Sequence, residues 1–204
     1  MPSSFYVRAG KRVFDLIFAI FGALLLSPLF VVAAMAVRLS GPGPVLFSHR
    51  RIGLNFKPFY THKFRTMLVN ADKNGSAITT CGDFRVTSIG RLLRKTKLDE
   101  LPQLFNVISG DMSLVGPRPE VARYVEMFKE DYKTVLCVRP GITDYAAIEY
   151  RNEEIILARY SDPQAAYAKE ILPAKIELYK KYISEQSFIT DLKIILKTLL
   201  RLVS

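Results

Sequence analysis

The sequence predicts a mainly helical α+β fold: an N-terminal helix–break–helix in a membrane, a small β-hairpin, and a helical core flanked by interfacial amphipathic helices. Three observations carry this prediction. Residues 13–37 form an apolar run broken by Ser27 and Pro28, residues 45–67 alternate like strands, and residues 101–108 repeat apolar side chains at helical spacing. We therefore expect a membrane element at residues 1–40 and one domain at residues 41–204 that lies on the membrane.

Composition supports this division and indicates acidic partners. The 204 residues are 50% hydrophobic, which is enough for one core and a membrane element. Lys and Arg number 29 against 19 Asp and Glu, giving a formal net charge of +10. A basic surface favours anionic lipid, phosphorylated substrates or nucleic acid. Neither a zinc site nor a disulfide framework is predicted from the spacing of Cys81, Cys137, His49 and His62.

The first element, Val13–Val37, carries a single charge at Asp15. At about 1.5 Å per residue such a helix is long enough to cross a bilayer. Pro28 cannot donate to the carbonyl oxygen of Leu24, so we expect a kink there, with the Ser27 hydroxyl partly satisfying a carbonyl of the preceding turn.

The charges on both sides of this segment set its expected topology. Basic residues flank both ends, and the positive-inside rule therefore prefers both ends in the cytoplasm: Arg8, Lys11 and Arg12 before, and Arg38, Arg50 and Arg51 after. A re-entrant helix that enters and leaves one leaflet satisfies the charges and the break together. A proline-kinked span with an exported N-terminus is the alternative.

Residues 45–67 are predicted to form two strands around Leu54 and Asn55, because β-branched and aromatic side chains recur there. Lys63 and Arg65 lie two residues apart, so on a strand they share a face. Two cations on one face suit a phosphate-binding wall, although a solvated polar face is the commoner arrangement.

The remaining segments are assigned by their turn residues and apolar spacing. Residues 68–83, which contain Asn74 and Gly75, are predicted to form a loop, and residues 138–143 a turn-rich loop carrying Arg139. Helices are expected at residues 84–94, 120–128 and 170–183. The tail, Ile189–Val203, places three cations on one helical face: Lys193, Lys197 and Arg201. That pattern is typical of a helix lying on an anionic membrane, and a helix docked on the core is an equally good interpretation.

The stretch on which the functional prediction depends is Thr96–Pro119, TKLDELPQLFNVISGDMSLVGPRP. We expect a helix that begins at Thr96 as N-cap, with Asp99 three residues later and Pro102 in the first turn. Gly110 is the expected stop. The buried stripe would be formed by Leu101, Leu104, Phe105 and Ile108.

Asp99 and Glu100 are adjacent carboxylates at the start of this predicted helix. They could simply complement the helix dipole, an effect of about 0.3–1 kcal/mol. A helix N-terminus also attracts phosphate, and Arg118 stands between two prolines in a rigid setting suited to bidentate phosphate binding. A carboxylate can attack phosphorus as a nucleophile, and a neighbouring carboxylate can hold Mg²⁺. These features favour an enzyme acting on phosphorylated substrates.

The run Leu98–Pro119 resembles a signature of the monotopic phosphoglycosyl transferases, also called bacterial sugar transferases. The resemblance extends from about Lys11 to the C-terminus and includes the Ser-Pro break and the Lys-Phe-Arg-Thr-Met run at residues 63–67. It implies transfer of a phospho-sugar from a uridine diphosphate sugar (UDP-sugar) to polyprenyl (undecaprenyl) phosphate, with release of uridine monophosphate (UMP). It also implies the cytoplasmic face of the bacterial inner membrane, and the first membrane step of polysaccharide or glycoconjugate synthesis.

The resemblance further implies a role for individual residues. Asp99 would be the nucleophile that carries a covalent phospho-sugar, and Glu100 its partner beside Mg²⁺, with both carboxylates as metal ligands. Ser27 and Pro28 would form the membrane break and take no part in the chemistry. The candidate phosphate-binding residues of the cytoplasmic catalytic domain are Lys63, Arg65, Arg118, Arg139 and Arg151.

The chain departs from the family pattern after residues 138–143. The common run Gly-Trp-Ala-Gln-Val-Asn-Gly-Arg-Asn is here Asp144–Asn152, with Tyr145 for Trp and Glu149-Tyr150 for Asn-Gly. This departure leaves the donor open, and an acetamido sugar is the expected one. The chain resembles the minimal catalytic form of the family. Acceptor length, downstream pathway and oligomeric state, a homodimer included, are left open.

A second hypothesis is a membrane-anchored basic adaptor that binds acidic lipid or nucleic acid without catalysis. The anchor and the charge fit it equally well. Against it, the basic residues are scattered among prolines and strands, and the aromatic residues do not form a base-stacking set. We therefore expect no nucleic-acid partner.

Overall fold

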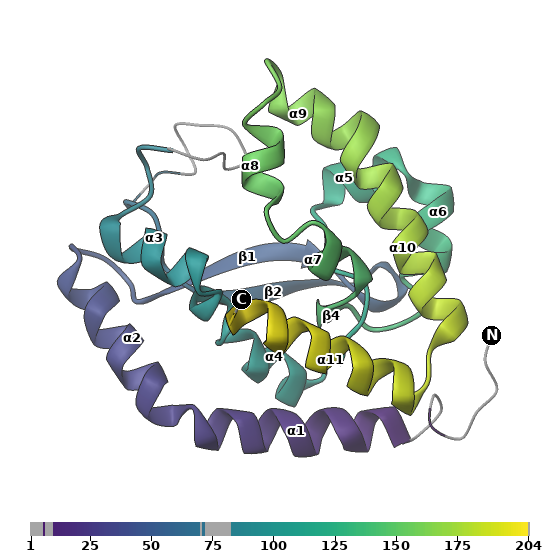
Figure 1. Ribbon diagram of the computed structural model, residues 1–204, viewed down its shortest axis with the longest axis horizontal. Helices are drawn as coiled ribbons and strands as arrows, with labels where there is room; N and C mark the ends of the chain where they lie inside the picture. The colour runs from purple at the N-terminus through teal and green to yellow at the C-terminus, as the bar shows by residue number, and fades with distance from the viewer. Residues whose placement is uncertain (1–5, 7–9, 70, 72–82, 204) are drawn as a thin grey trace.

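A computed structural model of the chain describes residues 6, 10–69, 71 and 83–203 (Figure 1). It is mainly helical with two small sheets, which confirms the predicted class. The helices are α1 (Lys11–Leu25), α2 (Ser27–Leu39), α3 (Ser88–Lys95), α4 (Gln103–Ser109), α5 (Ala122–Met127), α6 (Lys129–Val135), α7 (Tyr145–Glu149), α8 (Glu153–Leu157), α9 (Pro163–Ala166), α10 (Leu172–Glu185) and α11 (Phe188–Val203). The strands are β1 (Leu46–Ile52), β2 (Pro58–Phe64), β3 (Ser113–Val115) and β4 (Gly141–Thr143).

The apolar N-terminal segment is two helices that meet at Leu26. Their axes differ by 62°. Pro28 occupies the first turn of α2, where backbone N–H groups have no partner within the helix, so proline costs no hydrogen bond there. Among the described helices none is by itself long and apolar enough to cross a bilayer, whereas α1 and α2 together meet that requirement by length and composition. The predicted helix–break–helix is therefore present.

One side of this helix pair is buried against the protein and the other is bare. Ala19 of α1 packs with Leu104 and Val107 of α4, while Ala33 and Val37 of α2 pack with residues of β2 and α3. The opposite side exposes large apolar side chains, which is the arrangement expected of helices that meet lipid: Val13, Ile17, Phe18, Ile20, Phe21, Leu24, Leu25, Val31, Val32, Met35 and Leu39.

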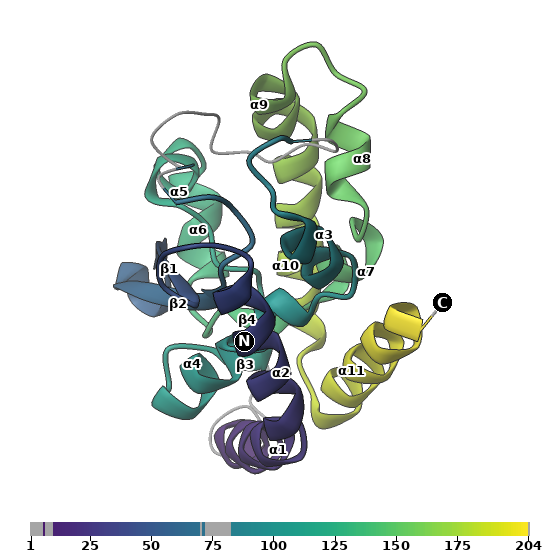
Figure 2. The same cartoon turned by 90° about the vertical axis from the view of Figure 1, so that its left-hand side faces the viewer.

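The predicted hairpin is confirmed. β1 and β2 pair antiparallel from Leu46 opposite Phe64 to Ile52 opposite Pro58. The connecting turn, Leu54–Phe56, contains Asn55 at a φ of 52°, a left-handed conformation that Asn tolerates well. The hairpin lies on the opposite side of the molecule from α8 and α11 (Figure 2). Most of the loop predicted at residues 68–83 lies outside the described residues.

A second sheet was not predicted. β4 falls within residues 138–143, which were expected to be a loop, and it pairs in parallel with β3. Strands of three residues are too short to show alternation in a sequence. The backbones of Gly116 and Gly141 approach so closely that a Cβ on Gly141 would collide with Gly116, so glycine is required there. This contact fixes the start of the segment that carries Arg118.

The C-terminal half supplies the larger hydrophobic core. The helices expected at residues 120–128 and 170–183 are present as α5 and α10, and α10 packs on α6 and α7. The most deeply buried side chains here are large and include several tyrosines: Tyr132, Leu172, Ile176 and Tyr179. Burial of this much apolar surface makes a rigid support for the loops that lead to α7 and Arg118.

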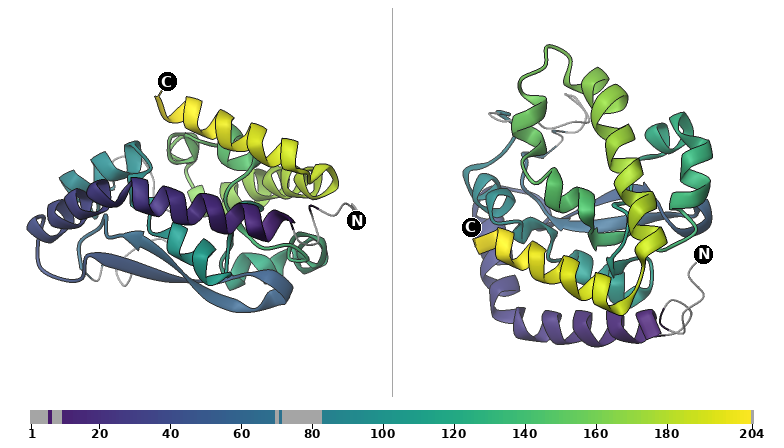
Figure 3. Two further views of the ribbon diagram at one scale, coloured as in Figure 1. Left: turned by 90° about the horizontal axis from the view of Figure 1, so that it is seen from below. Right: turned by 45° about the vertical axis from the view of Figure 1, so that its right-hand side comes forward.

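The tail forms one helix, as predicted; its docking on the core is confirmed, and its contact with a membrane stays a prediction. Ile194 is fully buried, so α11 is docked, yet Leu199 and Leu200 are more than half exposed. The start of α11 lies against the start of α1 (Figure 3). There the buried carboxylate of Asp191 accepts hydrogen bonds from Lys11 Nζ at 2.6 Å and from the Tyr182 hydroxyl at 2.8 Å.

Candidate active site

The two carboxylates lie in a tight turn, Leu98–Glu100, between α3 and α4. The prediction that Thr96 caps a helix here was wrong. Thr96 instead ends α3, donating its hydroxyl hydrogen to the carbonyl oxygen of Leu92 at 2.9 Å, and Lys97 follows in the left-handed conformation at a φ of 57°. The helix begins only after Pro102, and Gly110 ends it as expected at a φ of 97°.

Glu100 binds two cations from distant parts of the chain. Its Oε1 accepts a hydrogen bond from Lys63 Nζ at 2.6 Å, and Arg118 contacts both carboxylate oxygens, with Nη1 3.1 Å from Oε2. The structure therefore brings Lys63 and Arg118, two of the predicted phosphate-binding residues, to the turn that carries Asp99 and Glu100. Charge-assisted bonds of this kind are among the stronger ones in proteins.

Asp99 is adjacent in sequence but has a different environment. Only 7% of its surface is exposed, and within the described part of the chain its Oδ1 has no hydrogen-bond partner. An unpartnered carboxylate oxygen in a buried position is costly, at about 1–3 kcal/mol, and a catalytic role is one of the reasons for which proteins keep such a group. Glu100 is thus paired with two cations, whereas Asp99 keeps one carboxylate oxygen without a partner among the described residues.

These environments move the two pKa values in opposite directions. Burial raises the pKa of Asp99, and the neighbouring charge of Lys63 offsets that rise only in part. Burial alone would raise the pKa of Glu100 too, but the charges of Arg118 and Lys63 outweigh it and hold that pKa well below its ordinary value. Burial also lowers the pKa of Lys63. Carboxylates with separated pKa values are typical of sites in which each has a different task.

Lys63 is positioned by Asn106, a residue that no sequence pattern singles out. Asn106 of α4 is buried, and its side-chain amide bridges the β2 backbone, donating to the carbonyl oxygen of Tyr60 at 2.7 Å and accepting from the N–H of His62 at 3.0 Å. This bridge fixes β2, and with it Lys63, against α4, the helix that follows the turn that carries Glu100. A lone Asn on a helical face has no signature in a single sequence.

Arg118 is positioned by Asp144, which sequence reasoning noted only as part of an atypical run. Asp144 is 1% exposed. Its Oδ1 accepts a hydrogen bond from the N–H of Ala147 at 2.6 Å and so caps α7, while its Oδ2 accepts from the N–H of Arg118 at 2.9 Å. Burial raises the pKa of Asp144. One side chain therefore ties the loop after β4 to the loop after β3.

Two of the predicted phosphate-binding residues, Arg65 and Arg139, lie outside the Glu100 cluster and bind backbone carbonyl oxygens. Arg65 lies just beyond β2 and donates to the carbonyl oxygens of Pro42, Val37 and Gly41, so it binds the end of α2. The expectation that it shares a strand face with Lys63 was wrong because β2 ends at Phe64. Arg139 donates to the carbonyl oxygen of Gly110 at 2.9 Å.

Arg151 does not join the Glu100 cluster either. It lines a separate pocket between α8 and the end of α11. Arg94 of α3 joins α8 to the residues that follow β2. It lies 3.0 Å from a carboxylate oxygen of Glu154 on α8 and donates to the Thr66 hydroxyl at 2.9 Å. The charge of Arg94 also acts on Asp99.

The residues present fit a divalent cation in part. In the described ranges no three His, Cys, Asp or Glu side chains gather to hold a metal ion by themselves. Mg²⁺, however, commonly binds through one or two carboxylates with substrate phosphates supplying the rest. The free Oδ1 of Asp99 suits such a role, and Glu100 retains lone pairs that its two cations do not use.

Comparison with known proteins gives a consistent family. Residues 6–204 match the profile described as bacterial sugar transferase. The UDP-N-acetylgalactosamine-undecaprenyl-phosphate N-acetylgalactosaminephosphotransferase of Aeromonas hydrophila is 41% identical over 72% of this chain and 36% of its own length. The UDP-glucose:undecaprenyl-phosphate glucose-1-phosphate transferase of Escherichia coli K12 is 38% identical over 98% of this chain and 41% of its own length.

A relative of similar length matches as well. The exopolysaccharide production protein ExoY of Sinorhizobium fredii is 37% identical over 93% of this chain and 84% of its own length. The chain thus spans less than half of the two transferases above and most of ExoY.

Proposed function

The chain belongs to the bacterial sugar transferase family, and from this premise we propose that it is a membrane-bound phosphoglycosyl transferase. The donor is a UDP-sugar and the acceptor is a polyprenyl phosphate. Two relatives are named for these substrate classes, with undecaprenyl phosphate as the acceptor. The observation that carries the proposal is the buried Asp99, whose Oδ1 has no partner among the described residues, beside the Glu100–Lys63–Arg118 cluster.

In the proposed first step, the Asp99 carboxylate attacks the phosphorus that bears the sugar. A bond forms between that phosphorus and a carboxylate oxygen while its bond to the bridging oxygen breaks, and UMP leaves with the electron pair of that bond. In the second step, an oxygen of the polyprenyl phosphate attacks the same phosphorus. Asp99 leaves as the free carboxylate, and the product is a polyprenyl diphosphate sugar.

Glu100, Lys63 and Arg118 serve this reaction through charge. Glu100 holds both cations in place before the substrate binds, so little reorganisation is needed when charge develops on the transferring group. Lys63 has three N–H donors and Arg118 has five, and their bonds to Glu100 leave several of them available for phosphate oxygens. Asp99 must be ionised to attack, so its raised pKa confines activity to pH values above it.

Asp99 and Glu100 are the residues that would hold Mg²⁺. A bound Mg²⁺ supplies positive charge that neutralises phosphate oxygens and helps a phosphate leaving group depart.

We further propose that α1 and α2 form a re-entrant element with both ends on the cytoplasmic face of the inner membrane. The 62° bend and the bare apolar side of both helices support it, as do the basic residues at both ends. In this orientation, α11 presents its exposed leucines to the same lipid surface.

The test uses the full chain in detergent with Mg²⁺ and a panel of UDP-sugars that includes UDP-glucose and the two UDP-N-acetylhexosamines. Without acceptor, intact mass should show one phospho-sugar adduct, whose mass distinguishes a hexose from an acetamido sugar and so tests the expected donor class. Asp99→Asn should form no adduct because the amide is not a nucleophile. Asp111→Asn, which removes an exposed carboxylate from the same stretch, should form it normally.

Addition of polyprenyl phosphate should then release the sugar and allow UMP to accumulate. An adduct of unchanged yield in Asp99→Asn would overturn the assignment of the nucleophile. Failure of every donor to give an adduct or UMP would overturn the transferase and favour the anchored adaptor that binds acidic lipid.

A further inference from the structure

The apolar helix α1 contains one acidic residue, Asp15, that the proposed reaction does not use. An ionisable side chain in a membrane element is costly and is usually retained for a function. Asp15 does not lie on the bare side of α1, because it is only 2% exposed and is buried against the rest of the protein. Its partners there therefore indicate what the carboxylate does.

Asp15 binds the strand that leads to Arg118. Its Oδ1 accepts a hydrogen bond from the N–H of Leu114, the middle residue of β3, at 3.0 Å. The flanking residues Ser113 and Val115 pair with β4, so at Leu114 the side chain of Asp15 takes the place of a neighbouring strand. A backbone N–H in the interior of a protein needs an acceptor, and α1 supplies the one for β3.

A second side chain supports the same strand. The hydroxyl of Tyr182 on α10, which bonds to Asp191 at 2.8 Å, also lies 3.0 Å from the carbonyl oxygen of Val115. Asp191 in turn binds Lys11, whose Nζ lies 4.0 Å from Asp15. A buried polar network therefore joins α1, α10 and α11 to one strand of three residues.

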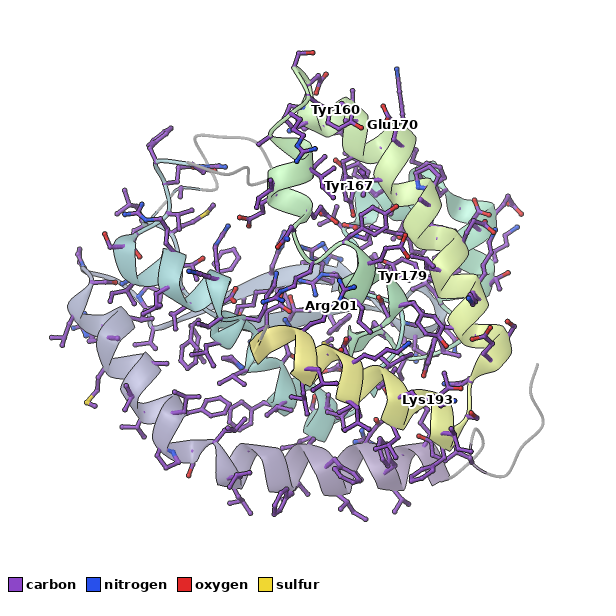
Figure 4. All side chains as sticks on the ribbon, viewed as in Figure 1. Tyr160, Tyr167, Glu170, Tyr179, Lys193 and Arg201 are labelled. Carbon is purple, nitrogen blue, oxygen red and sulfur yellow. The ribbon has the colours of Figure 1, made fainter. Side chains whose placement is uncertain are left out.

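This network lies where the first and last helices of the described chain meet. α1 exposes large apolar side chains on its opposite side, and the start of α11 lies against the start of α1 (Figure 3). In Figure 4, Lys193 marks this end of α11 and Arg201 marks the other end. Packing of α1 onto the protein therefore brings Asp15 to β3 and Lys11 to α11 together.

The position of β3 affects where Arg118 lies. The segment between them has little freedom, because the backbone of Gly116 packs against that of Gly141 with no room for a Cβ on Gly141. The far end of this segment is held by Asp144, which accepts a hydrogen bond from the N–H of Arg118 at 2.9 Å. A shift of β3 would therefore move the guanidinium group that contacts Glu100.

We propose that Asp15 is a positioning residue for the transfer reaction: its bond to Leu114 holds β3 and so places Arg118 against Glu100. This inference rests on the proposed function and extends it, because it makes α1 a support of the active site as well as a membrane anchor. The site would then be complete only when α1 is packed on the protein.

Two substitutions separate the hydrogen bond of Asp15 from its charge. Asp15→Asn keeps an oxygen that accepts from the N–H of Leu114, and Lys11 retains Asp191 as its closer partner, at 2.6 Å against 4.0 Å. Asp15→Leu removes the acceptor. We expect the single-turnover rate of adduct formation by the folded full chain in detergent to fall about ten- to hundredfold in Asp15→Leu and less than about threefold in Asp15→Asn.

Arg12→Gln is the control for the packing of α1. Arg12 donates to the carbonyl oxygens of Val107 and Ile108 at the end of α4, so it ties α1 to a different element. Its loss should lower the melting temperature and leave the adduct rate of the folded protein close to that of the wild type. An equal loss of rate in Arg12→Gln and Asp15→Leu would overturn the proposal, because any loosening of α1 would then have the same effect.

A double-mutant cycle tests whether Asp15 acts through Arg118. Arg118→Lys keeps a cation but loses the two-pronged contact with Glu100. Because β3 serves to place the guanidinium group, Asp15→Leu should reduce the rate much less in the Arg118→Lys protein than in the wild type. Losses that multiply in full would overturn the proposal.

Hydrogen exchange tests the hold on β3 without any substrate. The peptide that contains residues 113–118 should exchange faster in Asp15→Leu than in the wild type, and Asp15→Asn should stay close to the wild type. Unchanged exchange in Asp15→Leu would overturn the proposal even if the transfer reaction is confirmed. A wild type that forms no adduct would overturn the proposed function and with it the role of Asp15 in the reaction, whereas faster exchange in Asp15→Leu would still support its hold on β3.

Discussion

Asp99 and Glu100 are neighbours that should respond in opposite ways to loss of charge. Asp99→Asn removes a charge that burial disfavours, so the melting temperature in detergent should rise, by about 2–4 °C for each kcal/mol gained in a chain of this size. Glu100→Gln leaves Lys63 and Arg118 without their carboxylate and should cost about 3–5 kcal/mol. Both variants should be inactive, and each serves as the other's control. A fall in melting temperature for both would contradict this assignment.

The sign of the Asp99 effect also fixes its pH dependence. Its pKa in the folded state is raised, so wild-type stability falls as pH rises from the ordinary aspartate value, about 3.9, to that raised value. The stability of Asp99→Asn does not fall in this pH range, because the amide does not titrate. The stability difference between the two proteins should therefore be small at the acid end, grow through this window and stay constant above it. A constant difference at all pH values would argue against an ionised Asp99 in the folded protein.

Asp144 offers a test of positioning at a single atom. In Asp144→Asn, one oxygen can still cap α7, but the amide NH₂ replaces an acceptor, so either the N–H of Arg118 or that of Ala147 loses its bond. We expect UMP release to slow about ten- to hundredfold while the protein stays folded, because Arg118 is displaced. Asp162→Asn makes the same change at the exposed cap of α9 and should be neutral. Equal rates in both variants would show that Arg118 does not need this tether.

Among the elements, the break between α1 and α2 determines on which side of the membrane we expect the N-terminus to lie. Pro28→Ala restores an N–H that can bond to the carbonyl oxygen of Leu24, so a continuous helix becomes available across the break. We expect the N-terminus to move to the opposite side of the membrane in a part of the molecules, measured by accessibility labelling of a cysteine placed near residue 4. Pro173→Ala, at the start of α10 and remote from the break, is the control. An N-terminus that stays cytoplasmic would mean that packing against α4, rather than Pro28, sets the bend.

The elements predicted correctly are those in which the spacing of apolar residues repeats often enough to distinguish a helix from a strand or a loop. The broken apolar segment, the hairpin, α10 and α11 each repeat their signal over seven residues or more. β3 and β4, with three residues each, carry no period that distinguishes a strand from a loop. Thr96 was misassigned because a Thr before a turn can either start a helix or end one, and only the position of α3 decides.

For the whole molecule, the candidate site is an assembly of distant segments. Lys63 comes from β2, Glu100 from the turn after α3, and Arg118 from the loop after β3. The sequence motif located these residues, since two of them lie in one signature run. It could not locate Asn106 and Asp144, which hold backbone segments together. It also could not foresee that Arg65 and Arg139 bind backbone carbonyl oxygens away from Glu100, because the position of a cation depends on where its strand or loop ends.

The buried pair of Lys11 and Asp191 joins residues 180 positions apart, near the two ends of the described chain. During synthesis the first helix leaves the ribosome long before Asp191 exists, so Lys11 at first has only Asp15, 4.0 Å away on its own helix, as a carboxylate partner. The bond between Lys11 and Asp191 can form only once residue 191 has been made, whereas Arg12 can already bind the carbonyl oxygens of Val107 and Ile108. A nascent chain that stops short of residue 191 would therefore lack this bond, and the first helix of the described chain completes its packing only when α11 arrives.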